Sequence, residues 1–289
     1  MRKRDETRRG RQLGRAFGRR PGHSTVAAYL ALFVALGGTG AWAADRITSK
    51  DISKNAVRSK HIKKNAVATK KIKSNAVTAG KLACKGNSAQ DVMVRSGAVC
   101  IDRYESSIWT KRTGGTRITG AIPCNENGQD CKGKIFARSV KGVAPRASIT
   151  WFQAQQALAN SGKRLPSNAE WQQAVSGSPD AAPCNTDSGG PVNTGSMSGC
   201  VSNHGANDMV GNLWEWIADW GPLSDACGSW PAGYGDDFQC LAGANTTGAP
   251  GALLRGGAWF MDTGAGPFAV DGSSSPTSSF NSTGFRGAR

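Results

Sequence analysis

The chain has 289 residues, with 36 Lys and Arg against 20 Asp and Glu and a formal net charge of +16. This charge is uneven, because residues 1–23 carry +7, residues 45–85 carry +10 and residues 86–289 carry −1. The near-neutral majority is a poor candidate for a basic groove, so nucleic acid is not expected as a partner. The 38 Gly and nine Trp predict a loop-rich fold with an aromatic core rather than a disordered chain.

A basic segment precedes an apolar one at the N-terminus. Residues 1–23 contain nine Arg or Lys, and residues 24–44 contain no charged residue. An apolar helix of about twenty residues spans the core of a bilayer, so residues 24–44 are predicted to be a transmembrane anchor behind a basic cytoplasmic tail. Residues 26–36, with the small-x-small pattern at 41–43, equally fit a cleaved signal peptide. Both interpretations stay open, and both place the main domain outside the cell, either at the membrane or secreted.

All eight cysteines follow the apolar segment, which indicates disulfides in an exported protein. Zinc is disfavoured because no Cys-x-x-Cys pair is present. Sequence alone does not settle the connectivity, but pairing of neighbours would close short loops, each worth about 2–4 kcal/mol. The favoured pairs are Cys84–Cys100, Cys124–Cys131, Cys184–Cys200 and Cys227–Cys240.

Residues 45–85 form a basic tract with a ten-residue repeat. An apolar residue recurs every five positions, as at Ile52, Val57 and Ile62. This spacing keeps neither one helix face nor one strand face, so either a small solenoid or an extended spacer is expected. The tract is predicted to be a stalk. It would either touch anionic cell-wall polymers or lipid head groups, or, as we favour, act only as a solvated spacer.

Two helices are predicted in the domain at residues 91–289. Residues 148–162 show a helical pattern, with a hydroxyl residue available to cap the start and Gly162 available to end it. Ser167 and Glu170 have the spacing of a capping box, so a second, short helix is expected to start there and to bury Trp171.

Beyond the second helix, Gly, Ser, Pro and Asn dominate, interrupted by two aromatic clusters. The alternation Trp214-Glu215-Trp216 predicts a strand with both indoles on one face. The predicted fold class is therefore α+β, with two helices, short antiparallel strands, long loops and several disulfides.

Five ordered segments of the domain resemble a known family. They are residues 102–105 (Asp-Arg-Tyr-Glu), 162–171, 207–216, 254–259 (Leu-Arg-Gly-Gly-Ala-Trp) and 284–286 (Gly-Phe-Arg). Together they resemble the sulfatase-modifying-factor family, whose members include the formylglycine-generating enzyme, over residues 92–289. The resemblance implies a variant of the C-type-lectin fold with a buried Trp network.

The founding activity of that family is copper-dependent oxidation of a cysteine, and the resemblance places Met261 and Gly266 where the two copper-binding cysteines would be. No cysteine follows Cys240, and Cu(I) requires soft thiolate ligands. We therefore expect no copper and disfavour the oxidase interpretation. His204 is the one histidine of the domain, and we interpret it as a surface-loop residue rather than a catalytic base.

The resemblance also implies a calcium site. Its ligands would be the side chains of Asp208 and Glu215 and the backbone carbonyls of Gly211 and Leu213. Hard oxygen ligands on a loop suit calcium, although four positions do not fill its usual shell. The alternative is that Glu215 binds neighbouring backbone amides without a metal.

The C-terminal region resembles ligand-binding members of the same fold, in which a scaffold presents small and polar residues. An exported binding domain for an unknown protein, peptide, glycan or wall polymer is therefore the favoured function, and an enzyme of the formylglycine-generating type is the alternative. In the other interpretation of this region, its aromatic residues are core and its serines fill loops. The predicted binding residues are Trp259, Phe260, Asp262, Thr263, Phe268, Asp271, Ser273, Ser275 and Phe280.

Overall fold

The computed structural model describes residues 52–53, 56, 62–63 and 84–289. The predicted basic tail at 1–23, the predicted anchor or signal peptide at 24–44 and most of the stalk at 45–85 lie outside the described residues. Within the described part of the chain, no helix is both long enough and apolar enough to cross a membrane.

Two small hairpin-like pairs of strands form the N-terminal part of the domain. Each pair is antiparallel, and Met93 lies opposite Asp102 in the first while Ser106 lies opposite Ser139 in the second. The strands are β1 (Met93–Ser96) with β2 (Val99–Asp102), and β3 (Ser106–Trp109) with β4 (Phe136–Ser139).

The two predicted helices are present, as α2 (Trp151–Asn160) and α3 (Asn168–Val175). Thr150 caps α2 through a capping box, and Gly162 follows the helix with a φ of 68°. At the start of α3, the expected capping box joins Ser167 and Glu170. Each helix therefore begins where a side-chain hydroxyl can satisfy a free backbone N–H.

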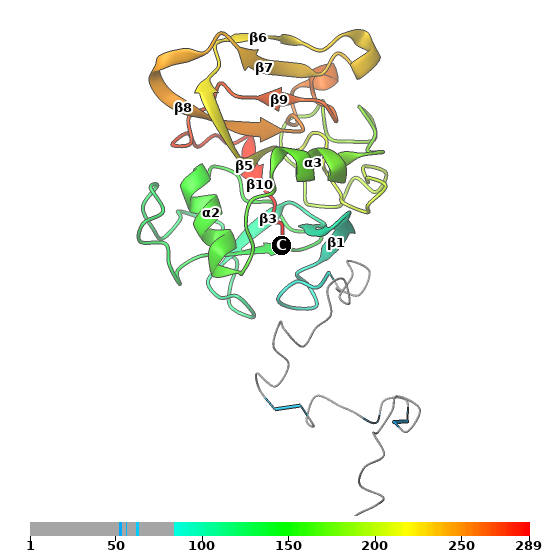
Figure 1. Ribbon diagram of the computed structural model, residues 1–289, viewed down its shortest axis with the longest axis vertical. Helices are drawn as coiled ribbons and strands as arrows, with labels where there is room; N and C mark the ends of the chain where they lie inside the picture. The colour runs from blue at the N-terminus through cyan, green and yellow to red at the C-terminus, as the bar shows by residue number, and fades with distance from the viewer. Residues whose placement is uncertain (1–51, 54–55, 57–61, 64–83) are drawn as a thin grey trace, which may run out of the picture. The chain divides into compact units, whose positions relative to one another are not determined.

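A six-stranded sheet forms the other part of the domain, in the order β10-β5-β8-β9-β7-β6. Figure 1 shows β6, β7 and β9 at one end of the domain and β1 and β3 towards the other, with α3 between them and α2 at the level of β3. The strands are β5 (Trp214–Leu223), β6 (Ala226–Ser229), β7 (Phe238–Ala242), β8 (Asn245–Arg255), β9 (Val270–Asp271) and β10 (Thr283–Phe285).

This sheet corrects the expectation of short antiparallel strands in two respects. The sheet is mixed, since β10 runs parallel to β5 and β7 runs parallel to β9. In addition, β5 has 10 residues and β8 has 11, and these two strands form a long antiparallel ribbon with irregular register. Parallel pairing arises here because β9 and β10 come from distant loops rather than from a hairpin turn.

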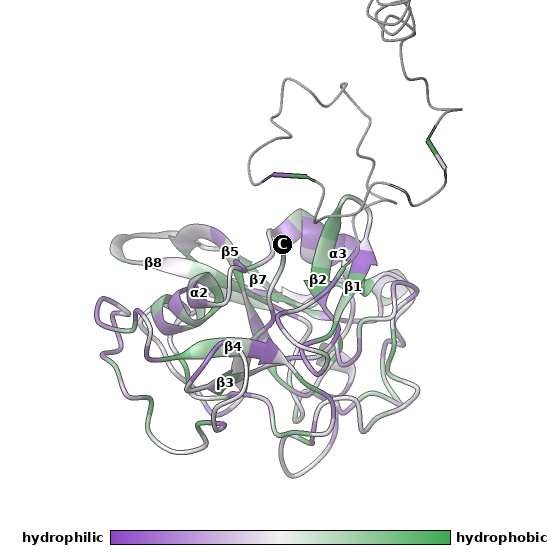
Figure 2. Cartoon of the chain, turned by 90° about the horizontal axis from the view of Figure 1, so that it is seen from below, coloured by the Kyte–Doolittle hydropathy of each residue, from purple (hydrophilic) through white to green (hydrophobic). Residues whose placement is uncertain are grey.

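Trp171 and Trp216 are the largest fully buried side chains of the core. Leu158 of α2 belongs to the same apolar cluster as Ile108 and Trp216, whereas Trp171 belongs to a second cluster. Full burial of one such aliphatic side chain is worth about 1.5–3 kcal/mol. Figure 2 shows several hydrophilic residues in α3, whose buried residues are Trp171, Ala174 and Val175, as expected for a helix that packs one face on the core.

All eight cysteines form disulfides, and each cysteine is paired with its neighbour in sequence, as favoured from the sequence. The pairs are Cys84–Cys100, Cys124–Cys131, Cys184–Cys200 and Cys227–Cys240. Four disulfides suit an oxidising compartment.

The C-terminal segment passes through the interior, since residues 282–288 are buried and only Arg289 is exposed. After β10 pairs with β5, the Gly287 carbonyl accepts from the N–H of Asp102 at 2.7 Å. The backbones of Arg289 and Cys100 then exchange hydrogen bonds of 2.8 and 2.9 Å. Residues 283–289 thus connect the large sheet to the first hairpin.

Candidate functional site

A buried ion pair between Glu215 and Arg286 lies inside the domain. The Nε atom of Arg286 is 2.8 and 2.7 Å from the two carboxylate oxygens, and Nη2 is 2.6 Å from Oε1. The indole N–H of Trp171 donates to Oε2 of Glu215 at 2.8 Å. Glu215 lies on β5 and Arg286 follows β10, so the parallel pairing of these strands brings the two charges together.

Two further buried carboxylates, Glu105 and Asp208, lie near this pair. Glu105 accepts from the side-chain amide of Asn212 at 2.5 Å and from the N–H of Leu213 at 3.1 Å. Burial raises the pKa of Glu105 well above its usual range, and repulsion by Asp208 raises it further. The cluster thus holds more carboxyl groups than cations, which favours protonation of one of them.

The remaining titrations follow from the same surroundings. Burial raises the pKa of Asp208 to about 6. Burial alone would lower the pKa of Arg286, but the carboxylate of Glu215 and its neighbours raise it above the usual value. The guanidinium therefore stays charged and also donates to the carbonyls of Asn207 and Asp208 at 2.9 and 3.1 Å.

These contacts bear on the predicted calcium ligands. Both oxygens of Glu215 accept from Arg286, whose guanidinium supplies the positive charge beside this carboxylate. The side chain of Asp208 already accepts a backbone N–H at 2.6 Å. The set as arranged does not fit calcium, because a cation beside Glu215 would have to displace a buried arginine. Calcium at Asp208, Gly211, Leu213 and Glu215 stays a prediction.

Lys163 is at the centre of a second buried charge cluster, which the sequence did not reveal. Its ammonium is 2.6 Å from Asp91 and 2.7 Å from Asp102, and none of the three side chains is exposed. Burial opposes the ionisation of Asp91, but Lys163 and the backbone donors lower its pKa overall. Burial raises the pKa of Asp102. This cluster joins the first hairpin to the loop after α2, and we assign it a structural role.

The positions expected to replace the copper-binding cysteines lie near the turn η6 (Asp262–Gly264). Met261 packs partly buried against the core. Gly266 is buried, and a Cβ atom there would collide with the carboxyl groups of Asp237 and Asp180. Carboxyl groups thus occupy the space that a thiol at position 266 would need.

Asp237 is fully buried and accepts the N–H of Phe268 at 2.5 Å. Burial raises its pKa to about 7, and the neighbouring Asp180 carboxyl adds to this shift. Its Oδ1 atom has no hydrogen-bond partner. Protonation of Asp237 therefore relieves its repulsion with the neighbouring carboxyl group of Asp180.

Among the described residues, one group of three possible metal-binding side chains is close enough to hold an ion, at Cys124, Asp130 and Cys131. The two cysteines of that group form a disulfide, so neither offers a thiolate. His204 is half-buried, and its own backbone N–H donates to the hydroxyl of Ser202.

The predicted binding residues fall into two environments. Phe260, Phe268 and Phe280 are 53%, 38% and 49% exposed, so they are not core. Trp259 is half-buried, with its ring centroid 4.9 Å from that of Phe260. Asp262 and Thr263 are exposed beside them.

The other polar residues of the predicted binding set form hydrogen bonds within their own loop. Asp271 is buried and accepts from the backbone and the hydroxyl of Ser273 at 2.7 and 2.6 Å. Ser275 pairs with Thr277 in a local turn at 2.9 Å. These contacts use the polar groups within the loop, which agrees with the interpretation of the serines as loop residues.

An exposed group of three rings, which we name the aromatic triad, consists of Trp230, Tyr234 and Phe268. Ring centroids lie 6.1 Å apart for Trp230 and Tyr234 and 5.2 Å apart for Tyr234 and Phe268. The indole N–H of Trp230 donates to the carbonyl of Phe268 at 3.0 Å. Only Phe268 is predictable from the sequence, because Trp230 and Tyr234 come from the β6–β7 connection and show no periodic pattern. Exposed aromatic clusters are typical of binding surfaces.

Comparison with known proteins places this geometry in context. The family model for the sulfatase-modifying factor enzyme 1-like domain matches residues 183–289. A hercynine oxygenase of Mycolicibacterium smegmatis is 30% identical over 142 residues, which are 43% of this chain and 32% of that protein. The serine/threonine-protein kinase pkn1 of Chlamydia pneumoniae is 32% identical over 130 residues, covering 40% and 19% of the two chains. The chain thus spans a third or less of these relatives.

Two solved structures are similar at lower identity. The Major Tropism Determinant P3c variant has a TM-score of 0.43 and 21% identity, covering 68% of this chain and 51% of that one. CarF has a TM-score of 0.38 and 17% identity, covering 66% and 85%. The family match rests on the sequence of the C-terminal region, which carries Glu215, the Arg-Gly-Gly segment and Arg286. Residues 183–289 of this chain are therefore similar in sequence to the sulfatase-modifying factor enzyme 1-like domain.

Proposed function

We propose that this chain is an exported surface protein whose domain, a C-type-lectin-like variant, binds a ligand without turning it over. The observation that carries the proposal is the state of the cysteines, since all eight are used in disulfides. Copper-dependent oxidation of a cysteine needs thiolates at the metal, and Met261 and Gly266 provide none.

The aromatic triad and Phe260 support a binding role. Tyr234 is 50% exposed, and the rings of the triad contact one another in tilted and edge-to-face arrangements. Aromatic rings supply large contact areas at a low cost in conformational entropy. The surface suits a peptide or a sugar face, both of which stack on exposed rings.

The N-terminal segments would determine where the domain is located in the cell. Residues 24–44 would hold the chain in the membrane or direct its secretion, and the basic stalk at 45–85 would separate the domain from the bilayer. The stalk's positive charge would also favour contact with anionic wall polymers. The four disulfides support the oxidising compartment that this arrangement requires.

The alternative function is enzymatic, as an oxidase of the formylglycine-generating type or a diverged enzyme of the same family. It is supported by the family match alone, and the matched hercynine oxygenase aligns with this chain over 32% of its own length.

The test uses the purified full chain in two measurements. Labelling with iodoacetamide before and after denaturation should give no labelled cysteine in either state. Binding to peptidoglycan sacculi and to an immobilised peptide library should then be measured for the wild type, Tyr234→Ala and Phe268→Ala. Leu241→Ala is the matched control, because Leu241 is 49% exposed but lies outside the triad.

We expect each triad variant to lose at least tenfold in affinity for the ligand that binds, and the control to lose less than twofold. A labelled native thiol, or an aldehyde formed on a Cys-x-Pro-x-Arg peptide with copper, would overturn the proposal. Equal binding by all three variants would overturn the role of the triad.

A further inference from the structure

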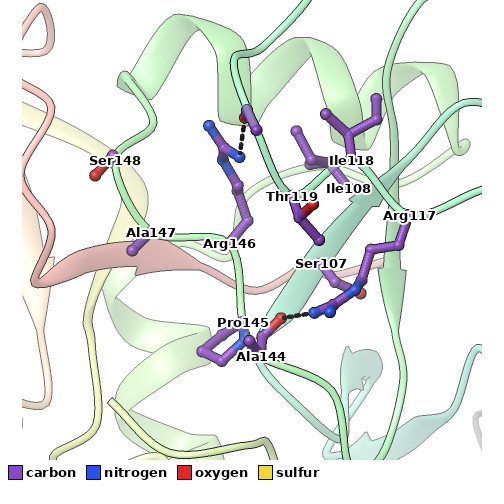
Figure 3. Close-up of a pocket in the computed structure, with 11 residues that line it drawn as sticks. Ser107, Ile108, Arg117, Ile118, Thr119, Ala144, Pro145, Arg146, Ala147 and Ser148 are labelled. Carbon is purple, nitrogen blue, oxygen red and sulfur yellow. Dashed lines mark hydrogen bonds between the residues drawn. The ribbon is translucent and has the colours of Figure 1, made fainter. Parts of the chain in front are cut away.

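A pocket of about 430 Å³ lies beside β3, away from the aromatic triad and from the buried ion pairs. Its size is within the range of small-molecule sites. Figure 3 shows two segments facing each other across it. The lining residues are Ser107, Ile108, Arg117, Ile118, Thr119, Gly120, Ala144, Pro145, Arg146, Ala147 and Ser148.

Backbone hydrogen bonds hold both walls of the pocket against β3. The N–H of Ile118 donates to the carbonyl of Ile108 at 2.8 Å, and the N–H of Arg146 donates to that of Ser106 at 2.8 Å. The walls thus do not need to order when a ligand arrives, which lowers the entropic cost of binding.

The pocket contains two arginines that also bridge its walls. Nη1 of Arg146 donates to the carbonyl of Gly120 at 2.8 Å, and Nη1 of Arg117 donates to that of Ala144 at 2.9 Å. A guanidinium has five N–H donors, so each bridging bond leaves further donors on the same group. The bridges fix both cations at the pocket.

No Asp or Glu lines this pocket, so the two positive charges have no counter-charge in it. Within the described part of the chain, neither Arg117 nor Arg146 takes part in an ion pair. Burial lowers the pKa of Arg146, and no carboxylate acts against that shift. A half-buried guanidinium without an anion is costly, so an anionic ligand would find it ready to pair.

The rest of the lining limits what carries the anion. Ile108, Ile118 and Pro145 present aliphatic surface, and Thr119 and Ser148 present hydroxyls. No aromatic side chain lines the pocket, so nothing there would stack on a nucleobase. The pocket also lacks the helix N-terminus or glycine-rich loop that commonly cradles phosphates.

We infer that this pocket binds a small aliphatic carboxylate, with the carboxylate against the half-buried guanidinium of Arg146 and the alkyl body against Ile108 and Ile118. Planar guanidinium groups match carboxylate oxygens in geometry and charge. This site goes beyond the proposed function, since it shares no residue with the aromatic triad or with Phe260.

The competing explanation is that the arginines only tie the two walls together. The two explanations differ in a measurable way, because a purely structural bridge requires no anion. The test is an NMR titration of the isotope-labelled full chain with isobutyrate, isobutyramide and methyl phosphate. Isobutyramide has the shape of isobutyrate without the charge, and methyl phosphate offers a different anion of similar size.

We expect saturable shifts with isobutyrate, affinity at least tenfold weaker for isobutyramide, and weaker binding of methyl phosphate. Arg146→Gln should weaken isobutyrate binding at least fivefold, and Arg117→Gln should weaken it less, because the guanidinium of Arg117 bridges the walls at the other end of the pocket. Arg112→Gln is the matched control, because Arg112 also donates to a backbone carbonyl, that of Asn160, but lies outside the pocket. Its affinity should stay within twofold of the wild type.

Ala144→Trp provides a second variant in case loss of an arginine bridge unfolds the walls. It keeps both guanidiniums but fills the pocket from an exposed position, so it should abolish binding with an unchanged melting temperature. Absence of saturable isobutyrate binding, equal affinity for isobutyramide, tighter binding of methyl phosphate, or full binding by Ala144→Trp would each overturn the inference.

Discussion

The guanidinium of Arg286 and the carboxylate of Glu215 form a hydrogen-bonded ion pair in which both side chains are at most 1% exposed. The two residues are 71 positions apart in sequence, yet the indole of Trp171 completes the set from α3. Three distant segments therefore meet at one charge pair, and the stability of the domain depends on its integrity.

The first prediction concerns this pair. Glu215→Gln should lower the free energy of unfolding by about 3–5 kcal/mol, because it leaves a buried guanidinium without its main counter-charge. Arg164→Gln breaks the exposed pair with Glu170 and should cost about 0–1 kcal/mol. Urea denaturation of both variants with disulfides intact measures the difference. Similar losses in the two variants would show that the buried pair has no special structural role.

The second prediction concerns pH. The pKa of Asp237 is raised from 3.8 to about 7 by burial and by Asp180. Between these values the folded state binds more protons than the unfolded state, so this group lowers the free energy of unfolding as pH rises from about 4 to about 7. Asp237→Asn removes the titration, and its stability relative to the wild type should be higher at pH 7.5 than at pH 4.

The control for this experiment is Asp236→Asn at an exposed neighbour with a φ of 57°, a conformation that Asn tolerates well. The comparison with this exposed neighbour separates the effect of the buried carboxyl from that of any Asp→Asn change in this loop. If Asp237→Asn behaved like this control in thermal melts across the pH range, the protonated carboxyl would be disproved.

The third prediction concerns the absent copper ligands. Met261→Cys with Gly266→Cys restores two cysteines but should not restore tight Cu(I) binding, because a side chain at 266 collides with Asp237 and Asp180. Overpacking should also cost about 1–3 kcal/mol of stability. Competition with a Cu(I) chelator measures the affinity, and Met261→Cys alone serves as the folded control. Stoichiometric Cu(I) capture by the double variant would contradict the steric argument.

The fourth prediction concerns the disulfide between Cys184 and Cys200, which lies in the second apolar cluster with Trp171. Replacing both cysteines by Ala should lower stability by about 2–4 kcal/mol, since the bond closes a loop in the unfolded chain. Denaturant midpoints of the variant and the wild type test this. An unchanged midpoint would mean that the surrounding packing alone fixes the loop.

Local signals predicted the parts of the fold that depend on a few neighbouring residues. Both helices begin at the expected hydroxyl caps, since a cap needs only residues three apart in sequence. The strand at Trp214–Trp216 was also correctly predicted, but it continues to Leu223. Glu215 was expected on the opposite side from the indoles, and it is buried as well because Arg286 lies against it.

The site was less predictable, because its parts meet through long-range pairing. Nothing near Arg286 in the sequence indicates that β10 would run parallel to β5. Trp230 and Tyr234 lie in an irregular connection, and Arg117 and Arg146 come from two loops without periodicity. Such residues become neighbours only after the strands that carry their loops have paired.

The course of residues 283–289 has a consequence for biosynthesis. A ribosome-bound chain that stops short of Thr283 lacks the strand beside β5, the cation opposite Glu215 and the backbone that closes on Cys100. Its helices and long ribbon would have no completed interior to pack against, so translation of the segment must precede assembly. A polypeptide of this design therefore becomes rigid only after residues 283–289 have been synthesised.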